Sequence, residues 1–223
     1  QAAAQGVDVI AATSHYRWSD NPTLEGNKVL LLVNEVNQAL KAAKVKLTVV
    51  AGCEIPFNEP EVLNIIMDAG LTYGGHAKAV LLEPSFKTFA ANGVDTVRQV
   101  MKSGMLPVIA HPERCAALRD DRVLLDKLVD LGAVLQVTAG SLYMGDPSDP
   151  IRQTANSLLA DGLVGVVASD AHNPERRSIQ MKHAYKYVSE KCGNTVADIV
   201  CNTIPRAIAL GQEVNHSDIY DAY

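Results

Sequence analysis

Residues 106–114 have the sequence LPVIAHPER, which gives the clearest indication of the fold. Five mostly apolar residues are followed at once by a histidine, a proline, a glutamate and an arginine. A short, nearly continuous apolar run is typical of a strand buried on both faces, and such strands belong to parallel sheets covered by helices. The stretch therefore predicts a buried parallel strand at residues 106–110, with His111 and Arg114 just beyond its carboxyl end.

The same arrangement recurs along the chain. Five further short apolar runs lie at residues 7–12, 46–51, 79–82, 134–138 and 164–168. Segments with apolar residues at helical spacing separate them, at residues 23–44, 60–69, 94–103, 122–131 and 151–161, and residues 179–211 are expected to be helical in two pieces with a break at 202–205. This alternation predicts an α/β fold with a parallel sheet.

Polar residues follow every predicted strand, and this feature discriminates between two architectures. An open, doubly wound sheet gathers its site at one switch point, whereas a barrel gathers it around the carboxyl ends of all its strands. We therefore expect a closed or partly closed (β/α) barrel. The sequence has no linker and no low-complexity stretch, so we interpret residues 1–223 as one domain.

Composition excludes several classes of protein. The net charge is −5 with scattered basic residues, which argues against a nucleic-acid partner, and no apolar run is long enough to predict a membrane span. The four cysteines form no CxxC pair, which favours free thiols in a reducing cytoplasm over a disulfide between Cys192 and Cys201. The sequence also lacks a nucleotide-binding P-loop, a G-x-S-x-G nucleophile elbow and a C-x5-R phosphate loop.

Six side chains that can bind metal ions come just after predicted strands. They are His15, Glu54, Glu83, His111, Asp170 and His172. A lone histidine or glutamate at such a place is more often an ordinary loop residue, but all six would converge on one rim of a barrel. Imidazole and carboxylate ligands together suit Zn, Mn or Fe, and a cluster of such ions can orient a phosphate and activate water.

Two arginines stand close to these residues in the sequence. Arg114 follows His111 by three positions, and Arg177 follows Asp170 by seven. A planar guanidinium can bind a phosphate through two parallel hydrogen bonds. Both arginines are therefore candidate phosphate-binding residues, with solvated surface arginine as the alternative.

The motifs resemble those of the PHP (polymerase and histidinol phosphatase) superfamily, and more closely the bacterial CpsB/YwqE-type tyrosine-protein phosphatases of capsule and exopolysaccharide operons. The resemblance runs from about residue 6 to about residue 211. The matching motifs are Thr13-Ser14-His15, Gly52-Cys53-Glu54, Leu82-Glu83, Ile109-Ala110-His111-Pro112-Glu113-Arg114, Gln136-Val137-Thr138-Ala139-Gly140-Ser141 and Ala168-Ser169-Asp170-Ala171-His172-Asn173.

The resemblance implies a distorted (β/α)7 barrel with up to three metal ions, often manganese (Fe, Zn, Mg or Co as alternatives), acting on phosphotyrosine of a partner tyrosine kinase. It implies that Glu54 bridges two ions and that Glu83 and His111 complete the second site. Asp170 would belong to the first site, and His15 with His172 to the third. Arg114 and Arg177 would bind the phosphate.

One departure from the family has consequences. The family opens with a strand carrying D-x-H-x-H, and this motif is absent, while residues 1–6 resemble the end of a helix. We expect a chain without the natural start of the domain, in which the first strand is lacking and the second metal site alone is complete. Metal occupancy should then be partial, activity weak, and the strand at residues 7–12 an exposed edge that can pair with another chain.

Two other functions remain open at this point. The chain could be a phosphoesterase that acts on a small phosphate ester such as histidinol phosphate. It could also be a catalytically impaired module that binds a kinase or a phosphotyrosine tail.

Overall fold

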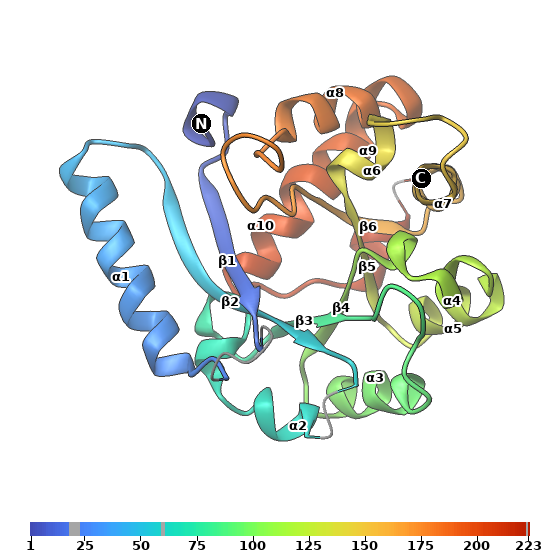
Figure 1. Cartoon of the computed structure of the whole chain (residues 1–223), viewed down its shortest axis with the longest axis horizontal. Coiled ribbons are helices and arrows are strands. Elements are labelled where there is room, and N and C mark those ends of the chain that lie inside the picture. Colours follow the sequence, from blue (N-terminus) through green and yellow to red (C-terminus); the bar gives the residue numbers. More distant parts are fainter. Residues whose placement is uncertain (18–22, 59–60, 222) are drawn as a thin grey trace.

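The computed structural model describes residues 1–17, 23–58, 61–221 and 223. In these residues the six strands form one sheet in the order β1-β2-β3-β4-β5-β6, and every neighbouring pair is parallel (Figure 1). The strands are β1 (Val9–His15), β2 (Thr48–Pro56), β3 (Ala79–Glu83), β4 (Leu106–Ala110), β5 (Val134–Thr138) and β6 (Val164–Ala168). The predicted parallel α/β architecture is therefore confirmed, and β4, β5 and β6 begin and end where the apolar runs do.

Helices connect consecutive strands, and further helices follow β6. The longer ones are α1 (Gly26–Ala42), α3 (Gly93–Lys102), α5 (Arg122–Asp130), α7 (Pro150–Ala160) and α8 (Met181–Cys192). The shorter ones are α2 (Val62–Ile65), α4 (Ala116–Arg119), α6 (Ala139–Tyr143), α9 (Asn194–Asp198), α10 (Ile204–Ala209) and α11 (His216–Tyr220). Within the described residues no helix is both long and apolar enough to cross a membrane.

The apolar runs become strands because both faces of the sheet are covered. In β4, Ile109 packs into the core beneath α3, α5, α7 and α8, while Val108 and Ala110 pack into a second core with Ile204 and Ile208 of α10. All three strand residues are essentially inaccessible to solvent. A strand with two buried faces cannot alternate polar and apolar residues, which explains the continuous runs.

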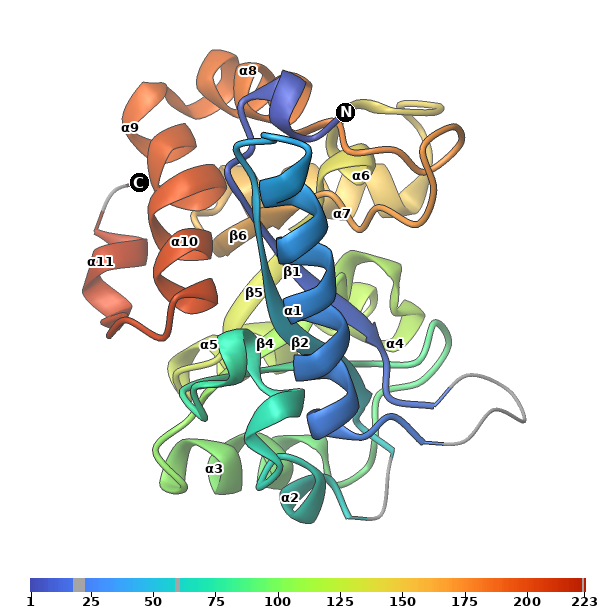
Figure 2. The ribbon, with the colours of Figure 1, turned by 90° about the vertical axis from the view of Figure 1, so that its left-hand side faces the viewer.

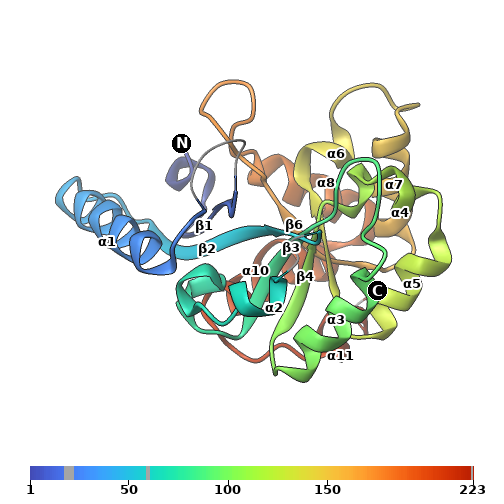
Figure 3. The ribbon, with the colours of Figure 1, turned by 60° about the horizontal axis from the view of Figure 1, so that its bottom comes forward.

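The sheet is curled into a half-barrel and is open between β1 and β6. Figure 3 shows the curl, with α1 at one end and α5 and α7 at the other. Figure 2 shows α1 lying along β1 and β2, where the Asn37 side chain bonds both backbone groups of Val49 at 2.7 and 2.8 Å. β1 is an edge strand in the described sheet, as predicted, because β2 is its one neighbour.

Two helix predictions were wrong in detail. The helix expected at residues 60–69, whose first position lies outside the described residues, shrinks to α2, because the Asp68 side chain accepts the amide hydrogens of Gly70 and Gly26 and begins a new turn. The break expected at residues 202–205 falls at Gly193 instead. The helix runs through that region because a π-helical turn, Ile199–Thr203, precedes Pro205 and accommodates the missing amide hydrogen.

Candidate metal centre and phosphate site

The candidate ligands from β1 to β4 meet at the carboxyl ends of these strands. His15 ends β1, Glu54 lies in β2 directly opposite His15 in the strand register, and Glu83 ends β3. His111 follows β4 without a gap. Parallel strands bring their carboxyl ends to one edge of a sheet, so residues far apart in the sequence become neighbours here.

The side chains of these four residues point at one another. His15 Nε2 lies 3.4 Å from Glu54 Oε2 and 3.9 Å from Glu83 Oε1. His111 Nε2 lies 3.1 Å from Glu54 Oε1 and 3.6 Å from Glu83 Oε1. Donor atoms of His15, Glu54 and Glu83 all fall within 4.8 Å of one another, so the three could share a single ion. We call these four residues the imidazole–carboxylate cluster.

Burial makes the charges of this cluster costly. Burial, followed by the charge of Glu54, raises the pKa of Glu83 from its ordinary 4.5 to about 7. Burial alone would lower the pKa of His111, but the hydrogen bond and the charge of Glu54 outweigh it and raise that pKa. Two carboxylates held this close favour a positive partner, either a proton or a cation.

Two of the site residues have a strained backbone. His111 has φ of 29° and Asp170 has φ of 48°, a region that non-glycine residues rarely occupy. Each lies within two residues of the end of its strand, β4 or β6. Strain of this kind costs on the order of 1–3 kcal/mol and persists where the surroundings hold it, as at binding sites.

Asp170 and the two arginines form a second group beside the first. Asp170 Oδ2 accepts hydrogen bonds from Arg114 Nη1 at 2.6 Å and from Arg177 Nη2 at 2.5 Å. The ring of His172 lies between the two groups: its Nδ1 is 3.5 Å from Asp170 Oδ1, and its centroid is 6.2 Å from that of His15. The structure thus brings all eight predicted residues to one end of the sheet, with Asp170 facing the arginines.

One supporting residue was present in the matching motif but was given no role by the sequence. Glu113 is completely buried, and its Oε1 accepts the amide hydrogen of Thr138 at 3.0 Å, which ties the turn after β4 to the end of β5. Burial raises the pKa of its carboxyl group. Its position in the HPER stretch, one residue before Arg114, could have identified Glu113 from the sequence.

His216 and the cysteines contribute no donor atom to the imidazole–carboxylate cluster. His216 begins α11, where its Nε2 contacts the Val129 carbonyl oxygen at 3.1 Å. All four cysteines are free thiols. Burial and the charges of Glu54 and Asp68 raise the pKa of Cys53 to about 12, so this thiol is a poor nucleophile at neutral pH.

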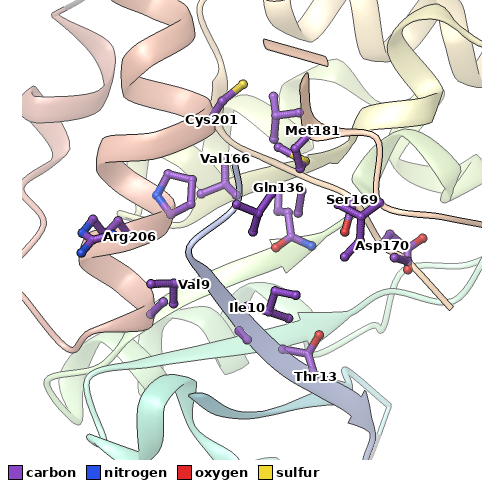
Figure 4. Close-up of a pocket in the computed structure, with 18 of the residues that line it drawn as sticks. Val9, Ile10, Thr13, Gln136, Val166, Ser169, Asp170, Met181, Cys201 and Arg206 are labelled. Atoms are coloured by element: carbon purple, nitrogen blue, oxygen red, sulfur yellow. The ribbon is translucent and has the colours of Figure 1, made fainter. Parts of the chain in front are cut away.

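Two hollows adjoin the site. The larger, about 1210 Å³, lies between β1 and β6 and is lined by consecutive residues of both strands, so it faces the two free strand edges. Figure 4 shows it with Ser169 and Asp170 on one side and Arg206 on the other. The smaller, about 290 Å³, shares Ser169 and Asp170 with the first and is also lined by Arg114 and Arg177.

Comparison with known proteins connects this geometry to one family. A family model described as "Capsular polysaccharide synthesis, CpsB/CapC" matches residues 1–209. The chain is 31% identical to tyrosine-protein phosphatase YwqE of Bacillus subtilis over 193 residues, which cover 85% of this chain and 73% of YwqE. It is 28% identical to tyrosine-protein phosphatase CpsB of Streptococcus pneumoniae over 212 residues, 93% of this chain and 86% of CpsB.

A solved structure agrees with the sequence comparisons. The fold superposes with a TM-score of 0.85 and 27% identity on a chain from the crystal structures of YwqE from Bacillus subtilis and CpsB from Streptococcus pneumoniae, described as unique metal-dependent tyrosine phosphatases. The match covers 96% of this chain and 85% of the other. The chain therefore belongs to the CpsB/CapC family, whose curated relatives are named tyrosine-protein phosphatases.

Proposed function

We propose that this chain hydrolyses phosphotyrosine on proteins with the help of divalent metal ions, and that its substrate is a bacterial tyrosine kinase of capsule or exopolysaccharide synthesis. One observation carries the proposal: the imidazole–carboxylate cluster lies next to two arginines that converge on one point. Imidazole and carboxylate suit a cation, and guanidinium suits a phosphate. Together they match a metal-dependent phosphatase.

The donor atoms of the cluster fit a first-row divalent cation. Two nitrogens and two carboxylates face a common space, and burial together with the charge of Glu54 raises the pKa of Glu83, a cost that a bound cation would relieve. We propose manganese, with Fe, Zn, Mg or Co as alternatives, because such mixed donor sets accept several ions. Fewer than three ions per chain are expected.

The residues divide between ion and phosphate. Glu54, Glu83 and His111 would hold one ion, and His15, Asp170 and His172 would contribute to any others. Such ions, when bound, supply Lewis acidity to a phosphate ester and lower the pKa of water toward neutrality. The protein's own part is to fix the ligands in place through the strand ends and through the buried Glu113.

Arg114 and Arg177 would bind and orient the phosphate. Both now donate to a single oxygen of Asp170, so their positive charges already converge on one anionic group. We infer that they exchange this carboxylate for phosphate oxygens when substrate binds. Phosphate is the better acceptor, because it offers several oxygens to the two guanidinium groups at once.

An exposed phenylalanine supports an aromatic substrate. Phe86 is 61% exposed, yet its ring centroid lies 6.0 Å from that of His111. Its backbone is held in place, because its carbonyl oxygen accepts the amide hydrogen of Ala116 at 2.8 Å. An exposed aromatic ring at the rim can pack against a phosphotyrosine ring, which favours an aryl phosphate over a small ester such as histidinol phosphate.

The direct test compares substrates. The purified chain is assayed with manganese on a phosphotyrosine peptide and on histidinol phosphate. Higher kcat/KM on the peptide supports the proposal, and higher kcat/KM on histidinol phosphate would favour the small-ester alternative. Binding of the peptide without turnover under any of the five metals would instead favour a catalytically impaired binding module.

Four finer points remain part of the proposal. We propose that residues 1–223 act as one domain, that the complete barrel is of the (β/α)7 type, that the free edge of β1 pairs with a second copy, and that the protein works in the cytoplasm. The unpaired side of β1 in the described sheet supports edge pairing, and the free thiols support a location in the cytoplasm.

A further inference from the structure

The smaller hollow beside the phosphate site is unusually basic for this chain. Four arginines line it, at positions 114, 152, 176 and 177, against two aspartates, at 149 and 170, which gives a formal charge of +2. The whole chain carries −5. We call this hollow the arginine pocket.

The two aspartates are already engaged. Asp170 is bound by Arg114 and Arg177. The Asp149 side chain caps α7 by accepting the amide hydrogen of Ile151 at 2.8 Å. Arg152 and Arg176 therefore contribute positive charge that neither aspartate neutralises by direct contact.

The positions of these two arginines are built by the fold. Arg152 lies in the first turn of α7, and its Nη1 donates to the Gly145 carbonyl oxygen at 2.8 Å. Arg176 lies in the turn after His172, where Asn173 Oδ1 accepts its amide hydrogen at 2.8 Å and that of Arg177 at 3.3 Å. Within the described part of the chain, the Arg176 guanidinium makes no hydrogen bond or ion pair.

A buried hydroxyl group adds a second, independent observation. Thr138 lines the arginine pocket at the end of β5 and is only 5% exposed. Its Oγ1 has no hydrogen-bond partner among the described residues. This oxygen is itself shielded from solvent, and it costs free energy, on the order of 1–3 kcal/mol, as long as it has no partner.

We propose that the arginine pocket binds a second anionic group of the substrate, on a residue adjacent to the phosphotyrosine. This inference rests on the proposed phosphatase function. Arg152 and Arg176 would receive the second group, while Arg114 and Arg177, which converge on Asp170 at the edge of the pocket, receive the phosphate to be cleaved. The group is either the carboxylate of an acidic residue or a second phosphate, since guanidinium binds both. At about 290 Å³ the pocket suits one side chain.

The experiment uses four substrates and four proteins. The substrates are p-nitrophenyl phosphate and three phosphotyrosine peptides that have neutral flanking residues, acidic flanking residues or a second phosphotyrosine. The proteins are the wild type, Arg152→Gln, Arg176→Gln and the control Arg98→Gln, which removes an equal charge from α3, a helix that does not line the pocket. The wild type should prefer an anionic peptide over the neutral one by about tenfold in KM, the equivalent of one charge-assisted hydrogen bond.

Each pocket variant should lose most of this preference, and Arg98→Gln should keep it. If the pocket variants lose the preference for the acidic peptide alone, the ligand is a carboxylate. If they lose the preference for the doubly phosphorylated peptide alone, the ligand is a phosphate. A wild type without preference, or pocket variants that keep it, would overturn the inference. Turnover of p-nitrophenyl phosphate reports separately on the phosphatase function, and if it is absent the same preference is measured as binding of peptides with a non-hydrolysable phosphonate.

Discussion

Replacing Glu83 by glutamine should stabilise the metal-free protein at alkaline pH. The folded-state pKa of Glu83 lies near 7, whereas an exposed glutamate has its ordinary value of 4.5. The native state therefore binds more protons than the unfolded state between these values, and stability falls as pH rises from about 4.5 through 7. The difference of pKa corresponds to about 3 kcal/mol, which screening at the 17% exposed side chain reduces to about 2.

The assay is urea unfolding in the presence of a chelator at pH 5 and pH 8. The free energy of unfolding of Glu83→Gln, relative to that of the wild type, should rise by about 2 kcal/mol from pH 5 to pH 8, because glutamine does not ionise. Glu35→Gln, on the exposed face of α1, is the matched control and should show no such growth. If the free energies of unfolding of the wild type and Glu83→Gln depended equally on pH, burial and the charge of Glu54 would not raise the pKa of Glu83.

Manganese should reverse this pattern. An ion that binds only the folded state stabilises it by about 2.7 kcal/mol at one hundred times its Kd. The wild type at pH 8 should show this gain, and Glu83→Gln should show much less of it. Glu83→Gln is thus expected to be more stable than the wild type without metal at pH 8, and to gain less stability than the wild type when manganese is added.

Three further predictions concern the phosphate site and the sheet edge. Arg114→Lys should lower kcat/KM by about tenfold to a hundredfold, because lysine cannot donate two parallel hydrogen bonds to phosphate; a change below twofold in steady-state kinetics would contradict this role. Phe86→Ala should lower kcat/KM on a phosphotyrosine peptide more than on an alkyl phosphate, and equal losses would remove the ring-packing role. The free edge of β1 should give concentration-dependent dimers in sedimentation velocity, whereas a monomer at every concentration would count against edge pairing.

The sequence predicted the strands well for a physical reason. A strand buried on both faces needs a run of apolar residues, and the runs at 106–110, 134–138 and 164–168 match β4, β5 and β6 residue for residue. The clustering of the eight candidate residues could be predicted because the ends of parallel strands lie together. That rule needs only the order of strands and no knowledge of side-chain geometry.

Other features depend on contacts that the sequence does not display. The expected helix break at 202–205 was wrong because a π-helical turn absorbs Pro205, and this depends on packing against β6. The partners of Asp170 could not be predicted, since its carboxylate could equally have faced His15. Arg152 and Thr138 join the arginine pocket from two different elements, and neither carries a local signal that marks it as part of a site.

Above all, we expect Glu54, Glu83 and His111 to hold a divalent cation within the imidazole–carboxylate cluster. Electron paramagnetic resonance of free manganese, during titration of the chelator-treated protein, counts bound ions directly. We predict at least one tight ion per wild-type chain and loss of that ion in Glu54→Gln, with binding retained in Glu35→Gln. No tight manganese in the wild type, or unchanged binding in Glu54→Gln, would contradict the account.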